Sequence, residues 1–133
     1  MKKLLIAPIA LFTMAIAPIA SATIITDVTP RNAICQAAQP CQVGAFHSLR
    51  IVNDTPQAQR YDWFMSVQAD NGDTVKQGGN VTLQPGEEFR KDKVNNWGYM
   101  KFNMKGRKLL HCTTQADGYE HGTITKTSWA DVS

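Results

Sequence analysis

The sequence lacks any basic block of five or more residues. Its 14 lysine and arginine residues are dispersed among 11 aspartate and glutamate residues. Setting aside Lys2 and Lys3 in the N-terminal segment leaves 12 basic against 11 acidic side chains, so the formal charge of +3 falls to about +1. A nucleic acid or an anionic membrane is therefore not an expected partner, because binding to either requires concentrated positive charge.

The sequence also lacks a helical period longer than a turn or two, an internal repeat and a low-complexity segment. Its only long apolar run lies in residues 1–22, where two lysines precede a mostly apolar stretch that ends in Ala20-Ser21-Ala22. About 20 apolar residues can span a bilayer, but this stretch is short and contains Pro8 and Pro18. The pattern predicts a cleaved bacterial signal peptide, and hence a periplasmic or secreted protein with no integral membrane segment after cleavage. The mature chain, residues 23–133, is long enough for a single domain.

Cysteine is scarce, with only Cys35, Cys41 and Cys112. In an oxidising compartment, three cysteines predict one disulfide and one remaining thiol. Cys35 and Cys41 enclose a short loop that closes with little rearrangement. A Cys41–Cys112 bridge would close about 70 residues and would stabilise more in the chain-entropy model, at roughly 4 against 2 kcal/mol. We favour Cys35–Cys41, since proximity favours its formation and Cys112 lies in a strand-like pattern where a buried thiol is ordinary.

The clearest structural pattern is the alternation in Tyr61–Ala69, where every odd-numbered residue is apolar and most even-numbered ones are polar. A period of two over nine residues predicts a strand with one buried face. Alternating, β-branched or threonine-rich segments predict further strands in residues 23–28, 45–53, 75–77, 80–83, 99–104, 107–114 and 119–129. We expect loops at 31–43 and 90–96, an interruption of the strand at Gly78-Gly79, and a hairpin between 99–104 and 107–114 that pairs Met100 with Cys112.

Seven or eight short strands at spacings near ten residues predict an all-β fold, an antiparallel β-sandwich or alternatively a small β-barrel. The spacing, together with the corner Leu83-Gln84-Pro85-Gly86-Glu87, resembles the immunoglobulin-like architecture of bacterial periplasmic and secreted modules. The antibody-type Cys…Trp…Cys pattern has only a loose counterpart in Cys41, Trp63 and Cys112. The resemblance is one of architecture, and it implies a binding or assembly module.

Residues with catalytic or metal-binding chemistry form no strong pattern. His47, Cys112 and His121 have the residue types of a copper site, but the ligand loop of such sites places its second histidine only a few residues after the cysteine. His111 is expected on the opposite sheet face from Cys112. A Cys112–His pair lacks a nucleophile turn, and the carboxylates Glu87-Glu88, Asp70 and Asp73 lie in turns. We expect no cofactor and no catalytic residue.

Aromatic residues are better candidates for a binding surface. Trp97 and Tyr99 follow Asn95-Asn96 in a predicted loop and strand start, and Phe64 and Phe46 lie on the polar faces of their predicted strands. Clustered exposed aromatics mark binding sites, whereas packing beneath a loop is the competing explanation.

These observations predict a non-enzymatic exported protein that binds another protein, as an accessory or adaptor in a bacterial envelope or secreted assembly. Strand exchange at an open edge, such as Thr123–Thr127, is one mechanism, and a homodimer through Phe46 and Phe64 is compatible with it. One alternative is an inhibitor of a hydrolase such as lysozyme, acting through the Cys35–Cys41 loop. Another is a periplasmic metal-binding protein.

Overall fold

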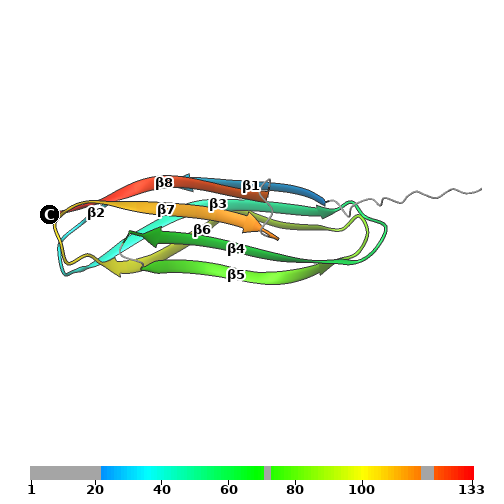
Figure 1. Cartoon of the computed structure of the whole chain (residues 1–133), viewed down its shortest axis with the longest axis horizontal. Helices are drawn as coiled ribbons and strands as arrows, with labels where there is room; N and C mark the ends of the chain where they lie inside the picture. Colours follow the sequence, from blue (N-terminus) through cyan, green and yellow to red (C-terminus); the bar gives the residue numbers. More distant parts are fainter. Residues whose placement is uncertain (1–21, 71–72, 118–121) are drawn as a thin grey trace, which may run out of the picture.

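The computed structural model describes residues 22–70, 73–117 and 122–133, and this part of the chain is all-β. The predicted signal peptide, apart from Ala22, lies outside the described residues, as does His121. Eight strands are formed: β1 Ala22–Pro30, β2 Ala33–Cys35, β3 Pro40–Asn53, β4 Gln59–Ala69, β5 Thr74–Leu83, β6 Glu88–Lys101, β7 Gly106–Ala116 and β8 Thr123–Val132. They form two sheets with strand orders β1-β3-β6 and β2-β8-β7-β4-β5, which pack face to face along the long axis (Figure 1). No helix in the described ranges is long and apolar enough to cross a membrane.

The predicted central strand is confirmed as β4, between β5 and β7 in the five-stranded sheet. Its odd-numbered side chains from Tyr61 to Ala69 are all buried. The alternation arises because successive side chains of a strand point to opposite faces of its sheet, and here one face meets the other sheet.

The interior consists of two apolar clusters separated by a polar pair. One cluster gathers around Val43, Val67 and Leu110, and the other around Ile51 and Met65. Between them, His47 in the middle of β3 and Thr114 near the end of β7 face each other, and both are fully buried.

The prediction of a loop at residues 90–96 is wrong, because β6 runs without a break from Glu88 to Lys101. A register shift opposite Ser48 and a positive φ of 48° at Lys93 mark a β-bulge there. Before the bulge, Lys91 points inward, with its ammonium 5.0 Å from the Trp63 ring centroid. Charged residues are depleted in strands but are common on protected edges, and β6 is an edge.

The prediction of a hairpin between residues 99–104 and 107–114 is also wrong. β6 pairs with β3 and β7 pairs with β4 and β8, so the segment between them crosses from one sheet to the other. Met100 lies opposite Cys41, and Cys112 lies opposite Val67 and Lys126. The crossing buries Phe102 but leaves Met104, which was expected on the same buried face, 71% exposed.

Three strand boundaries also differ from expectation. The loop predicted at 31–43 contains β2, which pairs in parallel with the C-terminal residues of β8, and β3 already begins at Pro40. β5 continues through Gly78-Gly79 in unbroken register with β4. β8 extends beyond the predicted end at Trp129 to Val132, because pairing with β2 and β7 supplies partners for its last residues.

Candidate functional site

The outer face of the three-stranded sheet presents three aromatic side chains and one arginine. We call Arg31, Phe46, Trp97 and Tyr99 the aromatic patch. The rings of Phe46 and Trp97 meet edge to face, with centroids 6.4 Å apart and an interplanar angle of 87°. The Arg31 guanidinium lies 4.9 Å from the Phe46 centroid and 5.4 Å from the Trp97 centroid, within cation–π range of both.

The position of Trp97 follows from the register of β3 and β6. Trp97 lies directly opposite Gly44, and a Cβ at Gly44 would come within 2.6 Å of the indole. The indole therefore occupies the space that a side chain at position 44 would fill. This packing explains why a half-buried tryptophan can lie on an outer face.

Tyr99 has no comparable explanation in packing. It lies two residues along β6 on the same outer face, opposite Gln42, and is 70% exposed. An exposed tyrosine beside an arginine and a tryptophan is the composition that recurs at the energetic centres of protein interfaces. The aromatic patch can bind a partner through stacking and hydrogen bonding.

Phe64 does not join this patch. It lies in β4 on the outer face of the five-stranded sheet, whereas Phe46 lies in β3 on the outer face of the three-stranded sheet. The sequence-based idea that these phenylalanines share one face is therefore corrected. Consecutive strands were assumed to be neighbours, but β3 and β4 belong to different sheets. Phe64 lies opposite Gly78, but the atoms nearest to a Cβ at Gly78 are main-chain and Cβ atoms rather than the phenyl ring, so the ring packing seen at Gly44 is not repeated there.

The described histidines are held apart. His47 is fully buried, with Nδ1 2.6 Å from the Thr114 hydroxyl and no hydrogen-bond partner for Nε2 among the described residues. Burial lowers the pKa of His47 to about 4. His111 lies on the outer face of the five-stranded sheet, with Nε2 3.0 Å from a carboxylate oxygen of Asp70. Within the described ranges, no three His, Cys, Asp or Glu residues are placed to hold a metal ion.

Cys112 is a buried free thiol that faces the interior from β7. Burial raises its pKa to about 11, so the thiol stays protonated at neutral pH and is a poor nucleophile. The carboxylates noted in turns have local partners, since Glu87 accepts a hydrogen bond from the Gln84 backbone at 2.7 Å.

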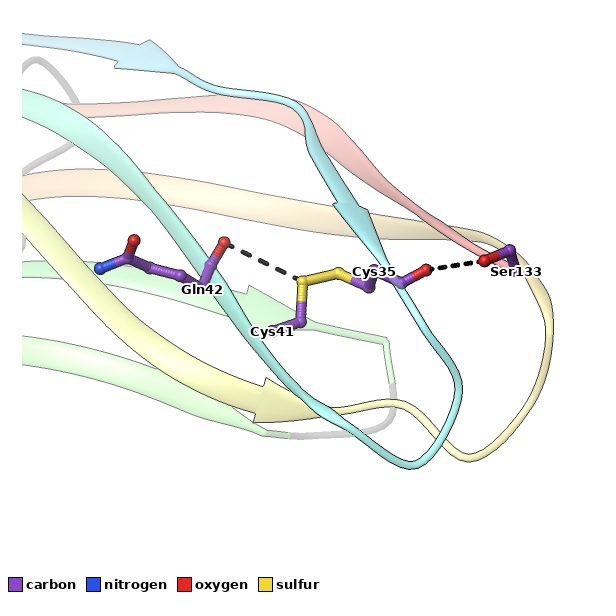
Figure 2. Close-up of a disulfide and its surroundings, with 4 residues drawn as sticks. All are labelled: Cys35, Cys41, Gln42 and Ser133. Carbon is purple, nitrogen blue, oxygen red and sulfur yellow. Dashed lines mark hydrogen bonds between the residues drawn. A yellow bond between two sulfur atoms is a disulfide. The ribbon is translucent and has the colours of Figure 1, made fainter.

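The structure joins Cys35 and Cys41 in a disulfide between β2 and the start of β3 (Figure 2). The residues between them are bound to their surroundings. The Ala37 amide donates to the Ser133 carbonyl and the Ala38 amide donates to the Phe102 carbonyl, at 3.0 and 2.9 Å. Ser133 also donates through its amide and hydroxyl to the carbonyl of Cys35. The loop therefore fastens β2 to the C-terminal end of β8 rather than projecting freely.

A cavity of about 470 Å³ opens near this end of the molecule. Its lining comprises Ala69, Asp70, Phe102, Asn103, Met104, Arg107 and Lys108. Two of its charged groups are already engaged, Asp70 with His111 and Arg107 with Asp131 at 2.9 Å.

Sequence reasoning missed Arg31 and Asn53. Arg31 follows Pro30 in a predicted loop. Only the fold brings its side chain over the rings of Phe46 and Trp97, which come 15 and 66 positions later in the sequence. Asn53 is fully buried, and its amide binds the carbonyls of Gln57 and Leu83 at 2.8 and 2.9 Å. Its side chain lies at the centre of the β3–β4 connection.

No family model matches the chain, and no curated protein matches it significantly. Among solved structures, the crystal structure of Bacteroides uniformis β-glucuronidase matches with a TM-score of 0.35 and 12% identity. That match covers 83% of this chain but 13% of the glucuronidase chain. A likeness this low supports no argument about activity.

Proposed function

We propose that the protein is an exported, non-enzymatic binding module that attaches to another protein through the aromatic patch. It would act as an accessory or adaptor in a bacterial envelope or secreted assembly. The observation that carries the proposal is the exposed Tyr99, 70% accessible beside the Arg31–Phe46–Trp97 group. Such clusters of aromatic and arginine side chains supply a large share of the binding energy in protein interfaces.

The immunoglobulin-like architecture is part of this proposal. The strand arrangement supports this part of the proposal, because β1 pairs with β3 in the three-stranded sheet whereas β2 joins β8 in the five-stranded sheet. The Cys35–Cys41 disulfide supports export, because such bonds persist in oxidising compartments.

The test is an affinity pull-down from envelope extract of the source bacterium. Tyr99→Ala should lose at least about tenfold in partner affinity, as expected for an interface hot spot, without loss of stability, since the side chain is mostly exposed. Trp97→Ala should lose binding as well, but it also uncovers Gly44, so its thermal stability must be measured in parallel.

Trp129→Ala is the matched control. Trp129 also has an arginine stacked on it, with the Arg107 guanidinium 4.6 Å from its ring, but it lies in β8 of the other sheet. A partner retained by the Trp129 variant and lost by the Tyr99 variant would support the proposal. Equal retention by both variants would contradict it and direct the search to the sheet edges.

A further inference from the structure

The edges of the two sheets differ in how well they are protected against pairing with another strand. β6 has a bulge and the inward-pointing Lys91, and β2 has only three residues. β1 ends at Pro30, and its Asp27 contacts Lys126 of β8 at 3.3 Å. Bulges, inward charges, prolines and short length are the devices that prevent edge-to-edge association.

β5 has no bulge, no inward-pointing charge and no proline, and it is not short; its one charged residue is the exposed Lys76. It is ten residues long, pairs with β4 in unbroken register, and contains neither proline nor a charged residue other than Lys76. Its residues from Lys76 to Asn80 are all exposed. Two of them, Gly78 and Gly79, consist of backbone alone, so their exposure means that main-chain atoms at this edge reach the solvent.

The sequence of β5 is nearly the same in both directions. Read outward from Gly78, Val75 corresponds to Val81 and Thr74 to Thr82, while Lys76 corresponds to Asn80. Two copies of one strand related by a twofold axis pair antiparallel, so each residue meets the residue at the mirrored position. A self-pairing centred on Gly78 therefore places valine opposite valine and threonine opposite threonine.

We infer that β5 pairs antiparallel with β5 of a second copy of this chain, with the twofold axis at Gly78. The two five-stranded sheets then form one continuous sheet. This register keeps inward side chains opposite inward ones, because paired positions have the same parity. It covers the half-buried Val75 and Val81 with their counterparts, and it places no like charges opposite each other, since Lys76 meets Asn80.

The register can be tested with charges at position 80. Asn80→Lys places a lysine opposite Lys76 of the second copy, and symmetry makes this contact twice. Like charges on directly opposite residues are destabilising, so the dimer should dissociate about two- to thirtyfold more readily. Within the monomer, Asn80 lies opposite Asp62, so the new lysine gains a favourable neighbour and the fold is retained.

Two further variants complete the test. Asn80→Glu should tighten the dimer by a similar factor, because each glutamate meets Lys76 of the second copy. The double variant Lys76→Glu, Asn80→Lys restores opposite charges and should recover the affinity lost in Asn80→Lys. Sedimentation equilibrium gives the dissociation constants, and thermal unfolding checks each fold.

A dimer whose affinity follows this order supports the pairing. A protein that stays monomeric up to about 1 mM overturns it, as does a dimer insensitive to all three variants. Loss of the dimer in Tyr99→Ala alone would also overturn it, by placing the contact on the aromatic patch.

Discussion

His47 makes stability depend on pH in a window that can be calculated. In the folded protein its imidazole is fully buried, and burial lowers its pKa from 6.5 to about 4. In the unfolded chain the imidazole titrates near its ordinary pKa. As the pH falls from 6.5 towards 4, the unfolded chain binds a proton that the folded protein does not, so acid favours unfolding.

The size of the effect follows from the difference between the two pKa values. The stability that the neutral imidazole contributes is fully present above about pH 6.5 and falls by roughly 3 kcal/mol as the pH approaches 4. Roughly 2 kcal/mol of this is lost by pH 5, where most aspartates and glutamates are still ionised. Between pH 7 and 5, the change in stability therefore reports the titration of histidine rather than that of the carboxylates.

Urea denaturation at pH 7, 6 and 5 measures the free energy of unfolding directly. His47→Asn keeps a polar group near Thr114 and removes the titration, so its stability should be nearly constant over this interval while the wild type weakens. His111→Gln, which removes the other described imidazole, is measured in parallel as the comparison variant. Parallel loss of stability in wild type and His47→Asn would refute the reasoning.

Three other substitutions have defined expectations, each measured by urea denaturation at pH 7. Gly44→Ala should lower the free energy of unfolding by roughly 1–3 kcal/mol, because the new Cβ would lie 2.6 Å from an indole carbon of Trp97. Gly79→Ala, whose new Cβ would have its nearest contact at 3.5 Å, should change it by less than about 1 kcal/mol. Equal effects of the two variants would contradict this packing. Replacing Cys35 and Cys41 together by Ser should cost about 2 kcal/mol, as expected for a short loop, and a loss near zero would contradict a stabilising bond. Asn53→Ala should cost roughly 2–4 kcal/mol, since it leaves several buried backbone groups without partners, and a neutral result would mean that water replaces the amide.

The parts of the fold that were predictable are those set by one segment alone. The alternation in Tyr61–Ala69 records which face is buried, and that information survives whatever strand pairs with it. The same reasoning failed for β6, because its exposed edge tolerates charge and its bulge reverses the parity of the pattern between Lys91 and Val94. It failed for the supposed hairpin after Tyr99 because a turn-like segment does not specify whether the next strand stays in the same sheet.

The candidate site was only partly predictable, for a related reason. From the sequence, Trp97 was predicted in a loop and Phe64 on the polar face of a strand, and both were candidates for binding. The register places each opposite a glycine, and Trp63, on the buried face, lies opposite Gly79. At Gly44 and Gly79 the indole rings lie next to the position that lacks a side chain, and such aromatic–glycine packing stabilises a sheet. Such pairing requires no partner protein.

Among the described residues, Tyr99 is the exposed aromatic residue that does not lie opposite a glycine, so it is the more informative position for function. It lies opposite Gln42 and shares its face with Arg31, which the chain supplies from the segment between the two sheets. Because the Tyr99 side chain makes no packing contact that explains its position, substituting it tests partner binding without an expected loss of stability. Trp97→Ala cannot do this, since it also removes the packing against Gly44. If Tyr99→Ala retained both stability and partner binding, the proposal that the outer face of the three-stranded sheet is the recognition surface would be contradicted.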